Sequence, residues 1–520
     1  MTTIIALWQL LQPDKLGFWV NLGIILTAVF CLWSAVTAIY NIFFHPLCHF
    51  PGPIVHCISR IPWAIRHARG EQAFYTQRLH DMYGPVVRIA PNHLSFTDPR
   101  AWKDIYYHRV GAVGGMVEMA KSTEFTRNVK GQLTTIVNAD QDEHQQLRRA
   151  LSHGFSDSSM RQQEPTMLKH INMLVDRLRT ESGKNPDMAA WYNWTTFDLS
   201  SDLIFGESFH CLQTVNYHPW VATIMKAIKF HAFMVALGYG GARPLVELIH
   251  KAGGFLAMKT MRGYIDSMLK SRLAMKQRHD DLFEGLAKRR DEWVMLSSPG
   301  LLKTGITDKL SVNATVLLLA GSETTATCLS GTTYFLLTHP EVLEKVTAEI
   351  RSAFSTDADI NIQSVNKLTY LIPVLNESLR MYPPLTSGMV REVPTGGAEI
   401  AGRFVPGDTL VEIQHWSINH SKENWVDPWS FRPERFMVDV KVAKEHSDML
   451  EAVQAFSMGP RNCIGRNLAM TEMRLILAKI LYNFDMKLAN GSHSWIERQK
   501  NYNVWDRIPL NVTLTPVEVK

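Results

Sequence analysis

The sequence predicts a mainly α-helical protein with a small β-rich part, preceded by one transmembrane helix. Three observations predict this fold class. Residues 16–44 contain no charged side chain and are almost wholly apolar. Segments with helical spacing of apolar residues occupy much of the remaining chain, whereas strand-like segments are few and short. The hydrophobic fraction of 46% and the charged fraction of 20% are those of a globular protein with a large buried core.

The apolar segment 16–44 is long enough to cross a bilayer, because about 20 apolar residues suffice for one helix. A cleaved signal peptide is the alternative, but its apolar core is only about 7–15 residues long and precedes a small-residue cleavage site. This segment ends instead in Tyr40, Phe43 and Phe44, aromatic side chains typical of a membrane interface. We therefore expect a short stub over 1–15 and a transmembrane anchor over 16–44.

The stretch HPLCHFPGP follows the anchor and cannot continue its helix, because proline lacks an amide donor and fixes φ. We expect a proline-rich elbow over 45–60 and one large domain over 61–520. Basic side chains follow the anchor more often than they precede it, which favours a cytosolic position for that domain.

Composition and missing motifs exclude several function classes. A net charge of +5 is small for 520 residues, and no basic stripe with interleaved aromatic residues is present, so we expect no nucleic-acid binding. The dinucleotide fingerprint, the phosphate-binding loop and HExxH are also absent. The six cysteines are scattered without a CxxC pair, which fits a reducing compartment better than a disulfide framework.

The periodicity of apolar residues locates the main elements. Helical spacing predicts helices over 310–337, 340–354 and 464–484. Strand-like alternation with turn residues predicts local hairpins over 85–98 and 388–416.

The stretch FSMGPRNCIGRNLAMTEMRLILAKI carries the strongest chemical signal in the chain. Its Cys463 lies where a glycine-containing loop runs into an amphipathic helix, so the helix N-terminus and free amides can stabilise a thiolate. Gly459 and Gly465 permit the backbone to approach a flat macrocycle. Arg461 can reach a propionate group of such a macrocycle, and Phe456 can pack beside the sulfur of Cys463. A buried structural cysteine is the alternative interpretation.

Phe456, Gly459, Arg461, Cys463 and Gly465 match the pattern FxxGxRxCxG, so the stretch resembles the haem-binding signature of the cytochrome P450 family. The segments HQQLRRALSHGFS, AGSETTAT and RNCIGRNLAMTEMRLILAKILYNF look most like fungal microsomal members of secondary metabolism. The resemblance covers nearly everything from residue 51 onwards. It implies the cytochrome P450 fold, haem b with Cys463 as the metal ligand, and monooxygenase activity.

The segments NESLR and FRPERF add a second family feature. Glu377 and Arg380 lie at i and i+3, on one helix face where they can pair. On its own, ExxR is most often a surface ion pair. In the family, the position of Arg435 completes a buried network with this pair. The resemblance therefore implies a structural network that fixes the loops around the haem cysteine.

The segment LLLAGSETTAT, residues 317–327, is the third feature. Gly321 followed by Ser and Thr in mid-helix invites a local break in the helical hydrogen bonds, and such a break can hold a water. A Thr/Ser patch on a helix is usually plain packing. The segment resembles the family's [AG]Gx[DE]T motif, however, which implies Thr324 at bound oxygen and Glu323 behind it as a proton relay.

Several basic residues are expected at the haem propionates. His144 and Arg148 lie at i and i+4 in HQQLRRALSHGFS, on one helix face. In the family this helix binds propionates, and Arg391 in GMVREVP matches a strand arginine with the same role. Together with Arg461 they suit a pair of carboxylates, although each alone is more often a surface cation.

The resemblance also implies partners and a location. Electrons would come from an NADPH-cytochrome P450 reductase docked on the cysteine side, at the endoplasmic reticulum membrane with the catalytic domain in the cytosol. The substrate pocket would lie near Ala320, 385–389 and 113–125. An apolar pocket suits a lipophilic secondary metabolite, such as a terpenoid, polyketide or alkaloid.

Two other function classes stay open at this point. A haem-thiolate isomerase or dehydratase shares the fold without activating oxygen, and such proteins tend to lose the acid–alcohol pair that Glu323 and Thr324 supply here. Turnover without NADPH would favour it. A non-enzymatic membrane haem sensor or carrier would need no ordered distal threonine. The absence of reductase-supported oxidation would favour that class.

Overall fold

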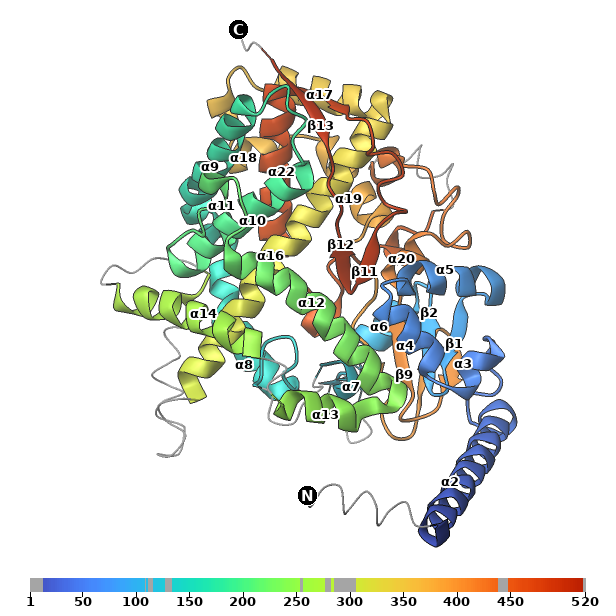
Figure 1. The fold of residues 1–520 in the computed structure, drawn as a ribbon. Helices are drawn as coiled ribbons and strands as arrows, with labels where there is room; N and C mark the ends of the chain where they lie inside the picture. Colours follow the sequence, from blue (N-terminus) through green and yellow to red (C-terminus); the bar gives the residue numbers. More distant parts are fainter. Residues whose placement is uncertain are drawn as a thin grey trace.

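The computed structural model describes residues 13–107, 109–110, 116–126, 133–252, 256–275, 282–284, 305–437 and 448–517. Residues 1–12, most of the expected stub, lie outside these ranges. Figure 1 shows a broad helical body from which helix α2 (Pro13–Ile39) projects, with the small sheet on the side of the body nearest to α2. The predicted fold class, a mainly α-helical domain with a small β-rich part and an N-terminal apolar helix, is confirmed.

Helix α2 continues as a π-helical turn, η1 (Tyr40–Phe44). Within the described residues, Gly17–Phe44 has a mean hydropathy of 2.2 in its most apolar window, and none of that window is buried in the protein. A second segment, Pro219–Lys251, also passes this test of length and composition, with a mean hydropathy of 1.4. One third of its window is buried and it packs against helix α4 (Ile61–Ala68), so it belongs to the body.

The junction between η1 and the body is fixed by hydrogen bonds to backbone carbonyls. The guanidinium of Arg88, which is 1% exposed, donates to the carbonyl of Asn41 at 2.9 Å and to the carbonyl of Pro91 at 2.6 and 2.9 Å. The amide of Asn41 donates to the carbonyl of Ile58 at 3.2 Å. These contacts tie the end of the apolar helix to strand β1 (Val86–Ala90) and to helix α3 (Ile54–Ile58).

The helical body is built around the long helix α16 (Gly305–Thr338), which runs through its centre (Figure 1). It packs most extensively against α10 (Met188–Phe205), and a buried hydrogen bond of 2.7 Å joins the hydroxyls of Tyr192 and Thr333. The other described helices of the body are α5 (Gln72–Tyr83), α6 (Ala101–Tyr106), α7 (Thr123–Thr126), α8 (Gln141–Ser152), α9 (Asp157–Thr180), α11 (Cys211–Thr214), α12 (Pro219–Leu237), α13 (Arg243–Lys251), α14 (Leu256–Ala274), α17 (Pro340–Ala353), α18 (Ile362–Val365), α19 (Leu371–Met381), α20 (His415–Asn419) and α22 (Arg466–Asn483).

The main sheet has the strand order β1-β2-β9-β6-β5. Strands β2 and β9 are parallel, and the other neighbours are antiparallel. In this register Lys121 of β5 lies opposite Arg391 of β6. The strands are β1 (Val86–Ala90), β2 (His93–Phe96), β5 (Ala120–Lys121), β6 (Arg391–Glu392) and β9 (Leu410–Ile413), and two-stranded ribbons pair β3 (Arg109–Val110) with β4 (Met116–Val117), β7 (Ala398–Ile400) with β8 (Arg403–Val405), β10 (Phe484–Leu488) with β13 (Val512–Pro516), and β11 (Lys500–Tyr502) with β12 (Val504–Asp506).

Among the described residues three apolar clusters stabilise this arrangement, and two of them hold most of the buried side chains. The larger one fills the space between α10, α16 and α22 with fully buried side chains such as Phe197, Leu318 and Ile476. The smaller one lies under the main sheet and includes Phe96 and Trp102. Burial of this apolar surface is the main driving force for folding, and it places the N-terminal end of α22 in the same body as α16.

Candidate active site

Cys463 lies in a tight loop directly before α22. The short 3₁₀ turn Gly459–Arg461 precedes it, and the Cys463 amide donates to the carbonyl of Phe456 at 2.8 Å, which closes the loop. The side chain of Cys463 keeps an exposed surface, but surrounding protein removes much of its hydration and raises the pKa of the thiol. The Gly465 amide and the guanidinium groups of Arg148 and Arg466 act in the opposite direction and favour the thiolate.

The two loop glycines have different roles. Gly459 has a φ of +73°, and a Cβ there would lie 2.1 Å from the carbonyl oxygen of Tyr106. The protein's own backbone in α6 therefore requires this glycine, whereas the sequence had led us to expect a macrocycle as the reason. At Gly465 a Cβ would lie 3.6 Å from Phe155 and 4.0 Å from the sulfur of Cys463, so this glycine keeps the surface beside the sulfur clear.

Phe456 packs at the edge of the larger core, and its ring lies 5.8 Å from the guanidinium carbon of Arg466. It therefore belongs to the wall of the cysteine loop through both its ring and its carbonyl.

Three cations and one carboxylate meet near the sheet edge, and we call Arg391, Arg461, Lys121 and Glu118 the Arg391 cluster. Arg461 binds Glu118 through Nη2 at 2.5 Å and through Nε at 2.6 Å, with both side chains nearly buried. It also donates to the carbonyl of Ala139 at 2.7 Å. Arg391 donates to the carbonyl of Met119 at 3.0 Å. The predicted Arg391 and Arg461 are thus brought together, and Lys121 and Glu118 are members that sequence reasoning missed.

The electrostatics of the Arg391 cluster show an excess of positive charge. Burial, together with the charges of Arg391 and Arg461, lowers the pKa of the Lys121 ammonium to about 7. Burial and Arg461 lower the pKa of His144 to about 4, so this histidine is a neutral hydrogen-bonding group at neutral pH. Glu118 is the carboxylate that opposes these cations among the described residues.

The chemistry of this cluster fits the carboxylates of a haem. The Nε of Arg391 and the Oε2 of Glu118 are buried and have no hydrogen-bond partner among the described residues. A buried donor without a partner is unfavourable, so a guanidinium in this state is suited to an anionic ligand. The residues present would hold a propionate pair through Arg391, Arg461, Lys121 and His144.

Arg148 points to a different place from the other predicted basic residues. It donates through Nη1 to the carbonyl of Asn462 at 2.6 Å and through Nη2 to the side-chain oxygen of Asn462. Helix α8 therefore contacts two places. Its Arg148 binds the loop of Cys463, and its His144 lies near the Arg391 cluster.

Helix α16 carries Thr324 and Glu323, and it is continuous across Gly321. The expectation of a local break is wrong in this structure. The Thr324 hydroxyl donates to the carbonyl of Ala320 at 2.6 Å and the Ser322 hydroxyl to that of Leu318 at 2.6 Å, so both polar side chains are satisfied within the helix.

Glu323 faces α10 and the C-terminal segment. Its carboxylate accepts from Arg507 at 2.8 Å and from Asn193 at 3.3 Å. The side chains of Glu323 and Arg507 are 1% and 4% exposed. Burial raises the pKa of Glu323, while Arg507 and Asn193 act against this rise. Sequence reasoning missed Arg507, because nothing in its local sequence indicates a partner on α16.

Some of the residues expected to line the substrate pocket have exposed surface. Ala320 is exposed although most residues of the central part of α16 are buried. Leu385 and Met389, at the ends of the predicted segment 385–389, are 39% and 36% exposed. Of the third predicted segment, 113–125, residues 113–115 lie outside the described ranges.

The sequence of the chain was compared with known proteins. A profile of the family described as Cytochrome P450 matches residues 50–513. The chain is 43% identical over 493 residues to cytochrome P450 monooxygenase tpeC of Talaromyces stipitatus, covering 92% of each protein. It is 40% identical over 492 residues to the trichothecene C-15 hydroxylase of Fusarium sporotrichioides, covering 93% of this chain and 96% of that enzyme.

A third relative, cytochrome P450 monooxygenase cpaH of Aspergillus oryzae, is 39% identical over 493 residues, covering 93% of this chain and 92% of that protein. The matched residues include the loop of Cys463 and the Arg391 cluster. Similarity of this extent agrees with the loop geometry and with the confirmed fold class. The chain belongs to the cytochrome P450 family and is a monooxygenase of the haem-thiolate type.

Proposed function

We propose that the protein inserts one oxygen atom from O2 into a lipophilic secondary metabolite, using electrons from an NADPH-cytochrome P450 reductase. The observation that carries this proposal is the position of Cys463, partly exposed between the N-terminus of α22 and a cluster suited to propionates. Haem b bound there through the Cys463 thiolate supplies the activation of dioxygen. Two similar proteins are named cytochrome P450 monooxygenases and one a trichothecene C-15 hydroxylase, which supports oxidation of a metabolite.

The chain's own residues supply substrate binding and protons. Ala320, Leu385 and Met389 offer apolar surface to a lipophilic substrate. Thr324 places a hydroxyl one helical turn after Ala320 and can orient a water there. Glu323, whose pKa is raised by burial, can hold a proton behind Thr324, and Arg507 and Asn193 orient its carboxylate.

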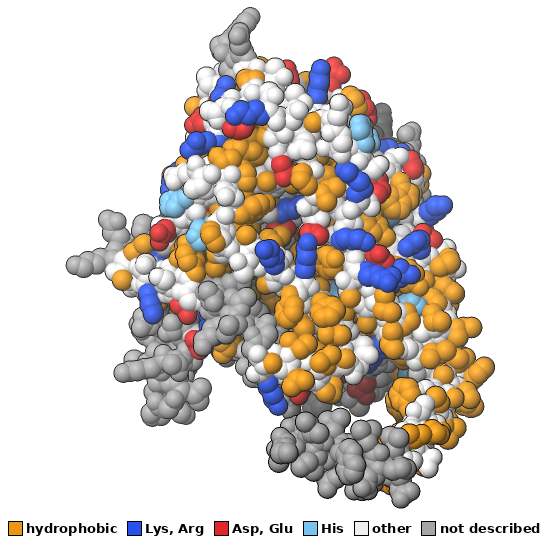
Figure 2. All heavy atoms as spheres, in the orientation of Figure 1, with side chains coloured by type: hydrophobic (Ala, Val, Ile, Leu, Met, Phe, Trp, Pro, Cys, Tyr) orange, Lys and Arg blue, Asp and Glu red, His pale blue; other side chains and the backbone are white. Residues whose placement is uncertain are grey.

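We infer a membrane location from the apolar segment Gly17–Phe44, with the catalytic domain on the cytosolic side of the endoplasmic reticulum. Figure 2 shows apolar side chains gathered on the face of the body beside this helix. Exposed apolar side chains occur on α3, α4 and α13, where Ile54 is 65%, Ile61 55% and Leu248 61% exposed. Exposed apolar patches of this kind favour contact with a membrane surface.

The role of Cys463 is tested by the spectrum of reduced, carbon-monoxide-bound protein. Wild type should show the strongly red-shifted Soret band of thiolate ligation, and Cys463→His should lose both this band and oxygenase activity. Cys328→Ser is the matched control, because Cys328 is buried in α16 and burial raises its pKa to about 12. A retained band in Cys463→Ser would contradict the proposal.

The role of Thr324 is tested by the ratio of product formed to NADPH consumed, with purified reductase and a panel of lipophilic metabolites read by mass. Thr324→Ala should keep haem and substrate binding but divert NADPH into peroxide. Thr315→Ala is the control, since its hydroxyl makes the same bond to the carbonyl four residues earlier, that of Ser311, at 2.9 Å. An unchanged ratio would mean that Thr324 only packs within the helix and has no role in proton delivery. Product formation without NADPH would favour the isomerase alternative.

The membrane location is tested by deleting residues 1–44. Most of the protein should leave the membrane fraction with its haem content largely intact. A residual bound fraction is expected, since Phe233 on α12 is 45% exposed and continues the apolar face. Secretion of a shortened protein would support the signal-peptide alternative.

A further inference from the structure

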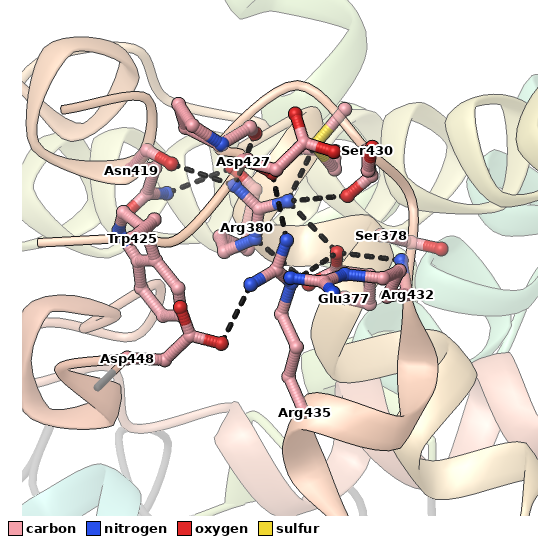
Figure 3. Close-up of polar contacts among 12 residues, drawn as sticks. Glu377, Ser378, Arg380, Asn419, Trp425, Asp427, Ser430, Arg432, Arg435 and Asp448 are labelled. Atoms are coloured by element: carbon pink, nitrogen blue, oxygen red, sulfur yellow. Dashed lines mark hydrogen bonds and ion pairs between the residues drawn. The ribbon is translucent and has the colours of Figure 1, made fainter. Parts of the chain in front are cut away.

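A buried network on α19 contains more positive charge than its one glutamate can neutralise. The carboxylate of Glu377 binds Arg380 twice, from Nε at 2.7 Å and from Nη2 at 2.8 Å. Both side chains are 0% exposed. Figure 3 shows the guanidinium of Arg380 surrounded by backbone oxygens, with Arg435 beside it. The Arg380 guanidinium also donates to the carbonyls of Asn419 at 2.7 Å and Pro428 at 2.8 Å.

Arg435, the second guanidinium, has another carboxylate as its short contact. Its Nη1 lies 2.6 Å from Oδ2 of Asp448. Its Nε lies 3.4 Å from Glu377 but makes no hydrogen bond there. The Arg435 and Asp448 side chains are 1% and 4% exposed. Sequence reasoning had paired Arg435 with the Glu377–Arg380 pair alone, and the structure adds Asp448.

Charge balance explains why a second carboxylate is present. Two guanidinium groups and one carboxylate would leave one positive charge buried without compensation, which is strongly unfavourable. Asp448 brings the set to two positive and two negative charges. We call Glu377, Arg380, Arg435 and Asp448 the Glu377 network.

Asp448 also lies in the stretch of chain that leads to Cys463. Its Oδ1 accepts the amide of Val426 at 2.7 Å, and the amide of the next residue, Met449, donates to Asn424 at 2.8 Å. Further along, the indole of Trp102 donates to the carbonyl of Ala452 at 3.1 Å. The segment is therefore held to the body from Asp448 onwards, before it forms the cysteine loop.

We propose that Asp448 is a positioning residue for the thiolate ligand, acting through Arg435 to hold the stretch of chain that leads to Cys463. This inference rests on the proposed role of Cys463. Asp448→Asn keeps the shape of the side chain and removes its charge, so that the two buried guanidinium groups of Arg380 and Arg435 share the single carboxylate of Glu377. The rate of haem loss should rise roughly tenfold or more, with a smaller thiolate-type Soret band after reduction and carbon monoxide, because an unpaired buried charge destabilises its surroundings.

Asp427→Asn is the matched control. Asp427 is exposed and its side chain contacts the Ser430 hydroxyl, while Arg435 uses only its backbone carbonyl, at 2.7 Å. Asparagine tolerates the left-handed φ of +51° at this position. This variant should keep the wild-type spectrum and rate of haem loss. Equal effects of the two substitutions would overturn the assignment.

The double variant Asp448→Asn/Arg435→Gln separates charge balance from a general structural role. Removing both charges should restore part of the thiolate band and slow haem loss relative to Asp448→Asn alone. Additive damage would overturn the proposal. If Asp448→Asn yields no folded protein, recovery of folded, haem-loaded protein in the double variant supports the proposal, and its continued failure contradicts it.

Failure of this inference differs from failure of the proposed function. If Cys463 is not the ligand, wild type itself lacks the thiolate band. If Cys463 is the ligand but Asp448 does not position it, wild type shows the band and Asp448→Asn keeps it.

Discussion

Two charged clusters in this molecule differ in whether the chain neutralises its own charge. The Glu377 network holds two guanidinium groups and two carboxylates, with short contacts of 2.6–2.8 Å for each arginine. The Arg391 cluster holds three cations and the single carboxylate of Glu118, and it leaves a buried donor of Arg391 without a partner among the described residues.

This difference separates structural charge from binding charge. A buried set of charges with internal balance needs no ligand, so it can hold loops in place whether or not a cofactor is present. A buried set with excess positive charge is costly until an anion arrives, and it is therefore suited to binding one. The balanced network should thus control folding, and the unbalanced cluster should control affinity for the haem carboxylates.

The largest expected effect comes from breaking the balanced network. Arg380→Met leaves the buried carboxylate of Glu377 with only its longer contact to Arg435, at 3.4 Å, and we expect a loss of about 3–5 kcal/mol in the free energy of unfolding. Denaturant unfolding of the haem-free protein measures it. Arg100→Met is the control, because the Arg100 side chain is 72% exposed and its pair with Asp98, which is in contact with water, should contribute little to stability. Similar losses in both variants would contradict the structural role.

Removal of a cation from the unbalanced cluster should act on the ligand and leave folding nearly unchanged. Arg391→Met should weaken haem binding roughly ten- to hundredfold, corresponding to about 1.5–3 kcal/mol for a hydrogen bond to a charged group. The haem-free protein should be as stable as wild type. Transfer of haem to an acceptor protein measures the affinity, and Arg403→Met, an exposed arginine on β8, is the control. If Arg391→Met were less stable than wild type but bound haem with wild-type affinity, the Arg391 cluster would have a structural role and the prediction would be wrong.

Removal of the Glu118 carboxylate should increase the excess of positive charge in the Arg391 cluster and so increase its difference from the Glu377 network. Glu118→Gln should retain haem at least as well as wild type and raise the reduction potential of the iron, because less negative charge nearby favours the reduced form. Potentiometric titration of the haem bands measures this shift. Glu124→Gln is the control, since Glu124 lies in the same segment and pairs with Arg60 at 2.8 Å, with its side chain 34% exposed. A lower potential in Glu118→Gln would contradict the prediction.

The smallest effect concerns the pH dependence of stability. The pKa of Lys121 is about 7 in the folded protein and 10.5 as its ordinary value. Between these values the unfolded chain binds more protons, so this group makes the haem-free protein more stable as pH rises from about 7 to about 10. Lys121→Met should remove this increment. Unfolding curves at a series of pH values give the free energy of unfolding of wild type and variant. If this free energy depended on pH in the same way in both proteins, the pKa of Lys121 would not be lowered by folding.

Local sequence is sufficient to predict those elements of this protein that depend on interactions between residues close together in the chain. The apolar run 16–44, the helical spacing on both sides of Gly321 and the pattern around Cys463 each lie within a few dozen residues. They predict the N-terminal helix, the long helices and the loop before α22, and the confirmed fold class follows from them. Each depends on backbone hydrogen bonding and on burial of one helix face, and both can be read from periodicity.

Which charged side chains lie next to each other could be learned only from the tertiary structure. Lys121 lies opposite Arg391 in the register of β5 and β6, and Asp448 forms an ion pair with Arg435, which is 13 residues earlier in the chain. The pair of Glu323 and Arg507 joins the centre of α16 to the C-terminal segment. Such pairs depend on which charges lose water together, and no local pattern encodes that. The absence of the break expected at Gly321 was also visible only in the structure, where α16 is continuous and the hydroxyls of Ser322 and Thr324 bond back to carbonyls four residues earlier in the same helix.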